Sequence, residues 1–403
     1  MGKLRLMKPI LDETTETLIK NCNNAIDKGQ GEPVELKAIC GAFTMDTIVQ
    51  IAFGVKIDSL MDRNNPLLKH ARAIFQTDLS LSNLFILAMT FLAPSVVSFF
   101  GLRMNDSAIT YFGKLSGDII KNKKEMLKHS NNNNSESSKA TNYIELLLEA
   151  ENERLKLEAQ QEQEQEKQNS DQQSIKAIKY MTDDEIVAQC VLFLMVGYDT
   201  TATAITLTLY NLACNPVFQE RLYEEIKSNI EEFKYQNQDE QEFNAIKMFS
   251  FERIQKMKFL EAVIKETLRL YPPATFTERV ASEDVTLENG SEPIYVKKGD
   301  VINIPIYSIH RDPSLWKNPD SFNPDRFMES TPTYHKYSYL PFGSGPRNCI
   351  AKRLAYLEVQ TAVFHVIREF KFIKCPKTPI PVQFYFQPNL ILKDVHFIIE
   401  KRN

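Results

Sequence analysis

The strongest pattern of hydrophobic and polar positions runs from Thr182 to Cys214. Thr182 and Glu185 form a T-x-x-E capping box, and Asn215 and Pro216 stop the apolar run that follows. The middle of this run, CVLFLMVGYDTTATAITL, is apolar on nearly every face. The sequence therefore predicts one helix of about 33 residues, roughly 50 Å long, that passes through the interior of the protein.

Further helices and a few short strands surround this segment in the sequence. Apolar residues at helical spacing predict helices within residues 4–60, from about Phe251 to Leu270, and after Cys349 to about Phe370. The β-like runs are VTLE, IYV and VINIPIY in the middle of the chain, and PVQFYF and VHFIIE near its end. We therefore expect a mainly α-helical fold with small β sheets.

An uncharged stretch occupies residues 84–102, LFILAMTFLAPSVVSFFGL. Its length alone would allow a membrane span. Pro94 in its middle argues against one straight helix, although lipid tolerates such kinks. A buried or membrane-surface hairpin of two short helices is the favoured interpretation.

Polar, low-complexity runs interrupt the chain on both sides of a short apolar helix, NYIELLLEA. These runs cannot bury enough apolar surface to fold, so disordered insertions are expected near residues 130–141 and 158–176. A further surface loop is expected at residues 234–244. Residues 1–403, with these insertions, are expected to form a single domain.

Composition narrows the function classes. Hydrophobic residues make up 43% of the chain and charged residues 25%, which is ordinary for a globular protein. The net charge is -4, so nucleic acid is not an expected partner. The 6 cysteines are scattered without a C-x-x-C pair, which suits a reduced intracellular setting. The opening residues, MGKLRLMKPILDETTETL, lack an apolar stretch, so no targeting segment is expected there.

The most informative motif is PFGSGPRNCIA, residues 341–351. Two glycines and two prolines fix an irregular loop that is expected to deliver Cys349 to the first turn of a helix. A helix N-terminus stabilises a thiolate, which is the form of cysteine that ligates metals. By itself, such a cysteine is more often a buried thiol or a nucleophile.

FGSGPRNC resembles the haem-binding loop of the cytochromes P450. The resemblance implies haem b with Cys349 as the axial thiolate on iron and with Phe342 and Gly343 beside the cofactor. It also implies that Arg279, in FTERV, and Arg347 pair with the haem propionates. The resemblance also implies a buried structural ion-pair triad formed by residues of two further motifs, KETLRLYPP and FNPDRF. By itself, an E-x-x-R pair would indicate a surface salt bridge. The triad consists of Glu266, Arg269 and Arg326.

The motif VGYDTT, residues 196–201, resembles the family's oxygen-activation motif. By this resemblance Asp199 and Thr200 are the catalytic residues that manage protons; the alternative is a locally hydrogen-bonded polar pair. Gly197 costs about 1 kcal/mol relative to alanine within a helix, so a packing or functional reason is expected, and close passage over a flat cofactor would supply one. Val196 stands where the family usually has alanine, so it is expected to narrow the substrate cavity.

The resemblance covers essentially the whole chain and is closest to the microsomal family-three branch, through GAFTMDTIVQIAFGVKIDSL and HRDPSLWKNPDSFNPDRF. It implies a monooxygenase that inserts one oxygen atom from O2 into an apolar drug, xenobiotic or steroid-like substrate. By this resemblance the sequence begins partway through the family's fold. About a hundred residues of that fold, including a membrane anchor, are therefore expected to be missing from this sequence.

Electrons would come from NADPH through a reductase that docks near Lys352 and Arg353, with cytochrome b5 as a further candidate. The implied location is the endoplasmic reticulum membrane, on its cytoplasmic face. Two alternatives remain open, an isomerase of the same fold and an inactive or non-enzymatic haem-binding fragment.

Overall fold

The computed structural model describes residues 2–29, 31–59, 65–75, 81–100, 106–131, 142–151, 181–236, 244–288, 290, 292–329, 334–385 and 389–402. Two compact units make up the chain: Met1–Ile10 with Ala42–Asp199, and Leu11–Gly41 with Thr200–Asn403. The expected insertions near 130–141 and 158–176 and the loop at 234–244 lie outside the described residues, except where helices end at residues 131 and 236. The expectation of a single catalytic domain stays a prediction.

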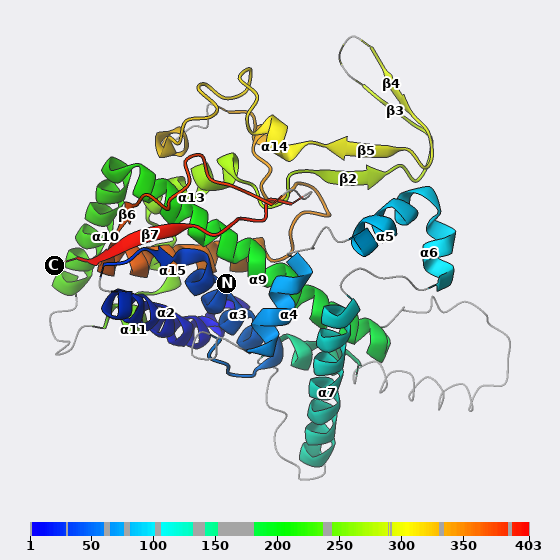
Figure 1. Ribbon diagram of the computed structural model, residues 1–403, viewed down its shortest axis with the longest axis horizontal. Coiled ribbons are helices and arrows are strands. Elements are labelled where there is room, and N and C mark those ends of the chain that lie inside the picture. The colour runs from blue at the N-terminus through cyan, green and yellow to red at the C-terminus, as the bar shows by residue number, and fades with distance from the viewer. Residues whose placement is uncertain are drawn as a thin grey trace. The chain divides into compact units, whose positions relative to one another are not determined.

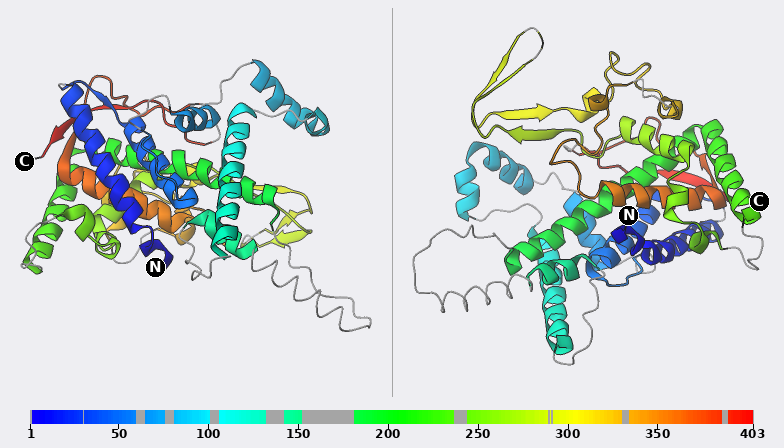
Figure 2. Two further views of the ribbon diagram at one scale, coloured as in Figure 1. Left: turned by 90° about the horizontal axis from the view of Figure 1, so that it is seen from below. Right: turned by 180° about the vertical axis from the view of Figure 1, so that it is seen from behind.

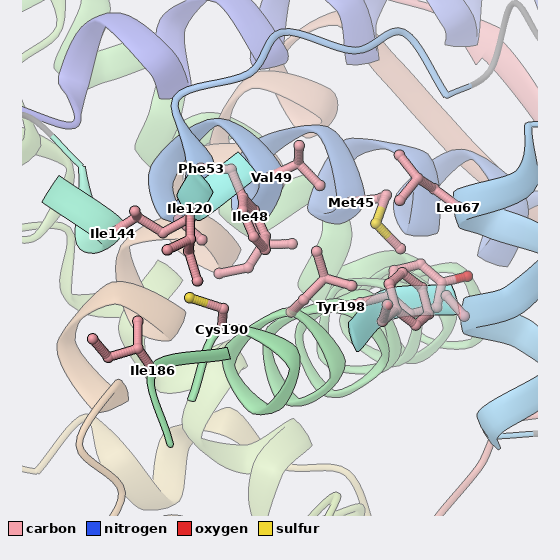
Figure 3. Close-up of a cluster of buried hydrophobic side chains, with 14 of the residues drawn as sticks. Met45, Ile48, Val49, Phe53, Leu67, Ile120, Ile144, Ile186, Cys190 and Tyr198 are labelled. Carbon is pink, nitrogen blue, oxygen red and sulfur yellow. The ribbon is translucent and has the colours of Figure 1, made fainter. Parts of the chain in front are cut away.

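The first unit is helical in its described part. Its helices are α1 (Gly2–Arg5), most of α3 (Leu36–Phe53), α4 (Pro66–Phe75), α5 (Leu81–Leu92), α6 (Pro94–Phe100), α7 (Asp106–Asn131), a helix over residues 143–151, and the first half of α9 (Asp183–Cys214). Figure 3 shows their shared core, in which buried side chains from α3, α7 and α9 meet. The helix over residues 143–151 confirms the prediction for NYIELLLEA.

Helix α9 confirms the longest predicted element. It spans 32 residues, and the capping box forms as expected, with the Thr182 N–H donating to the Glu185 carboxylate at 2.7 Å. In return, the Glu185 N–H donates to the Thr182 hydroxyl at 3.2 Å. Helices α3 and α9 are long and apolar enough to cross a membrane, but 89% and 67% of the residues in their apolar 18-residue segments are buried. Both are therefore core helices of the fold by their burial.

The described part of the uncharged stretch, residues 84–100, forms two short helices, α5 and α6, that are separated at residue 93 (Figure 1). This confirms the prediction of two helices in place of one span. Several large apolar side chains on them are open to solvent: Phe85 is 58% exposed, Leu92 82%, Phe99 83% and Phe100 68%. The helix pair therefore presents an apolar surface, and it is not buried.

The second unit contains the remaining helices. They are α2 (Lys8–Gly29), which starts in the first unit, α10 (Pro216–Gln236), α11 (Ala245–Met248), α12 (Phe251–Ile254), α13 (Lys258–Leu270), α14 (Ile306–Ile309) and α15 (Lys352–Glu369), with 3-10 turns η1 (Pro324–Phe327) and η2 (Lys336–Ser338). Helix α15 packs against α10, α12 and α13, and Figures 1 and 2 both show it as the orange helix beside the green α10. The helix predicted after Cys349 is confirmed.

The helix predicted from Phe251 to Leu270 is wrong in being continuous, because the chain breaks after α12 and restarts as α13. Met257, at the start of α13, gives no side-chain cap. Glu225 of α10 supplies it, because its carboxylate accepts from the N–H groups of Phe259 and Leu260, both at 2.9 Å. A neighbouring helix thus satisfies the free N–H groups of the first turn.

Three small antiparallel sheets complete the second unit. They pair β1 (Val34–Glu35), β7 (His396–Lys401) and β6 (Phe370–Lys374) in the order β1-β7-β6, β2 (Thr277–Val280) with β5 (Val301–Ile304), and β3 (Val285–Leu287) with β4 (Ile294–Val296). Strands β3, β4, β5 and β7 confirm VTLE, IYV, the start of VINIPIY, and VHFIIE. The strand predicted at PVQFYF is wrong for the described residues, which show a single isolated bridge, Phe384 to Leu392.

Candidate haem-thiolate site

The cysteine loop, defined here as residues 340–351, is held by its own backbone. Gly343 and Gly345 adopt positive φ angles of 68° and 78°, which favour glycine. The Gly343 N–H donates to the Leu340 carbonyl at 3.0 Å, and the Cys349 N–H donates to the Phe342 carbonyl at 2.9 Å. The two glycines therefore allow the chain to fold back and to fix the backbone at Cys349.

The position of Cys349 relative to the following helix differs from the prediction. Helix α15 begins at Lys352, after an N-cap at Ala351, so Cys349 lies in the turn before the helix and not in its first turn. The Lys352 N–H points back to the Cys349 carbonyl at 3.4 Å, which joins the turn to the helix start. The helix therefore orients the loop from just beyond the cysteine.

The groups that the loop presents suit a flat, apolar ligand with acidic edges. Cys349 is partly exposed and bears a free thiol. Beside it, Ile350 is 88% exposed, and Arg347 is exposed as well. A porphyrin supplies four nitrogen ligands to its iron, so one thiol from the protein is the donor set that haem needs. These residues therefore fit haem.

Two other residues predicted to bind the cofactor are Phe342, in the cysteine loop, and Arg279, in strand β2. Phe342 belongs to the loop, its ring centroid is 5.1 Å from that of Tyr356 on α15, and the Lys352 ammonium lies 5.8 Å from its ring centroid. Arg279 pairs with Ile302 across the β2–β5 ladder. Its guanidinium donates to the Thr277 hydroxyl at 3.0 Å and to the Glu278 carbonyl at 2.7 Å. These bonds hold the Arg279 side chain alongside its own strand.

The predicted catalytic pair lies on consecutive positions of α9. Asp199 is 6% exposed and is the last residue of the first unit, while Thr200 is half-buried and belongs to the second. Leu192, Val196 and Thr200 follow one another at i, i+4 spacing, so they share one face of the helix. Leu192 is 50% exposed and Val196 48%, so this face is apolar and open. Thr200 therefore ends an exposed apolar stripe.

Gly197 has a packing reason within the first unit, which is one of the two kinds of reason expected. A Cβ atom on Gly197 would lie 2.8 Å from Cγ1 and from Cδ1 of Ile48 on α3. One turn away, the Thr44 hydroxyl donates to the Tyr198 carbonyl at 3.0 Å. Close packing between α3 and α9 thus accounts for the glycine. Val196, the preceding residue, lies on the exposed face of α9.

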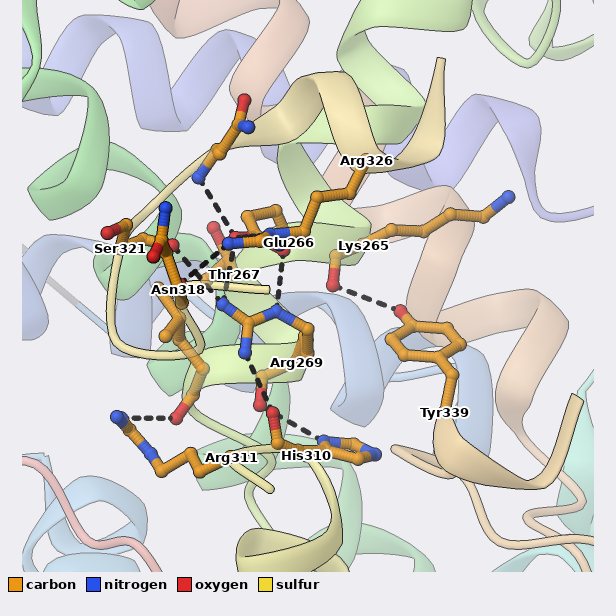
Figure 4. A network of polar contacts seen from close by, with 12 residues as sticks. Lys265, Glu266, Thr267, Arg269, His310, Arg311, Asn318, Ser321, Arg326 and Tyr339 are labelled. Atoms are coloured by element: carbon orange, nitrogen blue, oxygen red, sulfur yellow. Dashed lines mark hydrogen bonds and ion pairs between the residues drawn. The ribbon is translucent and has the colours of Figure 1, made fainter. Parts of the chain in front are cut away.

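The predicted ion-pair triad is confirmed in the second unit (Figure 4). Glu266 and Arg269, both fully buried on α13, form two hydrogen bonds of 2.7 and 2.9 Å. Arg326 adds a third contact to Glu266 at 3.2 Å. Arg269 also donates to the carbonyls of His310 and Ser321 at 2.7 and 3.3 Å. The triad therefore ties α13 to the segment that carries residues 310–326.

His310 belongs to none of the sequence motifs. It is fully buried, and its Nε2 accepts from the Leu340 N–H at 2.7 Å, at the first residue of the cysteine loop. The residue stands in HRDPSLW, a run that carries no pattern typical of a ligand or base. Only the fold brings it to the loop, 30 residues further along the chain.

Comparison with known proteins agrees with the motifs. A family model described as Cytochrome P450 matches residues 1–400. Cytochrome P450 3A29 of Sus scrofa is 32% identical over 383 residues, which cover 95% of this chain and 67% of the relative. Cytochrome P450 3A18 of Rattus norvegicus is 32% identical over 391 residues, covering 96% and 69%. Cytochrome P450 3A16 of Mus musculus is 32% identical over 405 residues, covering 99% and 70%.

Proposed function

Because the chain belongs to the cytochrome P450 family, and is therefore a haem monooxygenase, we propose that it inserts one oxygen atom from O2 into an apolar drug-, xenobiotic- or steroid-like substrate. The single observation that carries the proposal is the cysteine loop, which presents the free thiol of Cys349 next to exposed Ile350 and Arg347. The similarity to the three relatives named as members of the 3A group supports this choice of substrate class.

Cys349 would hold the haem iron as its axial thiolate. When bound, haem supplies the redox-active iron at which dioxygen is reduced, and a thiolate ligand favours cleavage of the O–O bond. Phe342 and Gly343 would pack beside the macrocycle, while Arg279 and Arg347 would pair with its carboxylates. For Arg279 this requires the guanidinium to turn from Thr277 and from the Glu278 carbonyl toward the cofactor.

The face of α9 that carries Leu192, Val196 and Thr200 would line the substrate cavity. Leu192 and Val196 would exclude water and bind apolar substrate surface. The Thr200 hydroxyl would donate a proton during the reduction of dioxygen, and the Asp199 carboxyl would replace that proton. The placement of a carboxyl and a hydroxyl on adjacent residues beside an apolar stripe supports these roles.

Replacement of Thr200 by alanine is expected to leave the haem absorption spectrum of the reduced carbon monoxide complex unchanged. It is expected to uncouple the consumption of NADPH from product formation. Without the hydroxyl, protons arrive out of order, and a larger share of the NADPH consumed should appear as hydrogen peroxide. Thr206→Ala is the matched control, because the Thr206 hydroxyl is fully buried and donates to the Ala202 carbonyl of its own helix, at 2.8 Å, with the Cys40 thiol as a further partner. Peroxide and product are measured per NADPH; equal coupling in both variants would make Thr200 structural and return the isomerase to consideration.

Electrons would reach the site from an NADPH-dependent reductase, with cytochrome b5 as a further candidate. Lys352 and Arg353, at the start of α15, are exposed close to the cysteine loop. A docked partner with acidic side chains would find complementary charge there, which raises the rate of association. The exposed basic pair next to Cys349 supports this face as the docking surface.

The protein would act at the cytoplasmic face of the endoplasmic reticulum membrane, with the α5–α6 pair against the lipid. An apolar surface made of Phe85, Leu92, Phe99 and Phe100 and free of charged residues suits the bilayer interface.

A Phe99→Ser, Phe100→Ser double variant should bind phosphatidylcholine vesicles at least about tenfold more weakly in a co-sedimentation assay, because each buried phenylalanine contributes about 1.5–3 kcal/mol. The control is Val217→Ser on α10, where another apolar side chain is 79% exposed. If Val217→Ser weakened binding as much as the double variant, the α5–α6 pair would not be the membrane contact.

A further inference from the structure

His310 is held on both edges and on one face. It follows α14 and is fully buried. Its Nδ1 lies 3.0 Å from the Arg269 carbonyl oxygen, and its Nε2 lies 2.7 Å from the Leu340 backbone nitrogen. The ring stacks on Tyr339 with 5.6 Å between centroids and 18° between planes. Figure 4 shows the ring beside Arg269 and Tyr339.

These contacts fix the tautomer of the ring. A backbone N–H can only donate, so Nε2 must be the acceptor and carry no proton. Nδ1 then carries the proton and donates to the Arg269 carbonyl. Burial lowers the pKa of His310 to about 4, so the ring is neutral near pH 7, as this arrangement requires.

The bond to Leu340 lies at the beginning of the cysteine loop. The Leu340 carbonyl accepts from the Gly343 N–H at 3.0 Å, and the Phe342 carbonyl accepts from the Cys349 N–H at 2.9 Å. At the other edge of the ring, Arg269 donates to the His310 carbonyl at 2.7 Å while the ring donates to the Arg269 carbonyl. A short series of hydrogen bonds therefore leads from the ion-pair triad to the backbone at Cys349.

We propose that His310 is a positioning residue for Cys349: its Nε2 anchors Leu340 to the ion-pair triad and so fixes the loop that places the sulfur. The proposal rests on the proposed role of Cys349 as the haem ligand. Leu340 is only 9% exposed, so water would replace Nε2 poorly as a partner for its N–H. Loss of this acceptor should therefore free the loop locally, even where the rest of the unit stays folded.

Two substitutions separate the edges of the ring. Asparagine places its amide near the Nδ1 position, so His310→Asn keeps a donor for Arg269 and loses the acceptor for Leu340. Glutamine places its carbonyl near the Nε2 position, so His310→Gln keeps the acceptor for Leu340. Each variant loses one buried hydrogen bond, so their thermal midpoints should fall by similar amounts. A difference between them at the loop then reports positioning and not general stability.

The test measures three quantities in both variants. They are amide hydrogen exchange of the peptide over residues 338–352, the rate of Cys349 alkylation by iodoacetamide in haem-free protein, and the fraction of the reduced carbon monoxide complex with the red-shifted Soret band of thiolate ligation. In His310→Asn, exchange and alkylation should rise about tenfold, which corresponds to one hydrogen bond, and the red-shifted fraction should fall. His310→Gln should stay within about twofold of the parent protein on all three.

The outcomes distinguish this proposal from the function on which it rests. Equal effects of the two variants on exchange and alkylation would overturn the role of Nε2, whatever the spectrum shows. If the parent protein lacked the red-shifted band while His310→Asn alone loosened the loop, the ligand assignment of Cys349 would fail and the positioning of the loop would stand.

Discussion

Replacement of Cys349 by alanine is expected to abolish the red-shifted Soret band of the reduced carbon monoxide complex and to reduce NADPH-dependent oxidation to background. The thiolate is the only axial donor that the cysteine loop offers among its described side chains, and the band depends on it. The loop itself should survive, because Cys349 contributes its backbone N–H to the bond with the Phe342 carbonyl. The variant therefore removes the sulfur alone.

The matched control is Cys214→Ala at the end of α9. Cys214 is free and partly exposed like Cys349, and burial raises the pKa of its thiol. It should keep the band and the activity of the parent protein. A red-shifted band that persists in Cys349→Ala, or that disappears equally in Cys214→Ala, would contradict the assignment.

The elements that the sequence predicts well are those whose signals are local. Residues at each end of α9 determine where the helix begins and ends. Thr182 and Glu185 form the capping box at its start, and Asn215 and Pro216 follow its last residue. The turn chemistry of the cysteine loop is local too, because Gly343 and Gly345 supply the positive φ angles. These local signals are therefore enough to predict the long helix and the loop.

The elements that the sequence predicts wrongly, or does not predict, depend on partners that are distant in the chain. Helix α13 starts where it does because Glu225 caps its first turn from α10. No strand was predicted at β6, which is held partly by Gln219, whose side chain bonds to the backbone N–H and carbonyl of Phe372 at 2.8 and 2.9 Å. Neither contact leaves a trace in the local pattern of apolar residues. A packing or functional reason for Gly197 could be expected from the sequence, but its packing partner could not be named, because Ile48 lies in another helix.

The candidate site divides in the same way. Cys349, Phe342 and Gly343 stand in one motif, so the sequence identifies them together. His310 carries no pattern by itself, and its importance arises from two backbone groups, 41 and 30 residues away, that the fold brings to its ring. The roles of all the site residues, which are Cys349, Phe342, Gly343, Asp199, Thr200, Arg279 and Arg347, stay predictions, because they concern groups that bind to the protein.

Replacement of Arg269 by methionine is expected to cost about 3–5 kcal/mol of unfolding free energy, a large share of the roughly 5–15 kcal/mol that holds a typical domain. The substitution leaves the carboxylate of Glu266 buried with fewer partners, and it removes the donors to the His310 and Ser321 carbonyls. Chemical denaturation followed by circular dichroism measures the loss. Because so large a loss can prevent folding, Glu266→Gln is the milder variant, which keeps the side-chain shape and removes one charge.

The matched control is the Arg221–Asp325 pair on the surface. Its N–O distance is 2.7 Å, the same as between Arg269 and Glu266, but its side chains are 44% and 49% exposed. Water screens such a pair, so Arg221→Met should cost only about 0–1 kcal/mol. The Glu266→Gln, Arg269→Met double variant should lose less than the sum of the two single losses, because each single substitution already breaks the same contact. Equal losses for the buried and the exposed arginine would mean that the triad does not hold this part of the fold together.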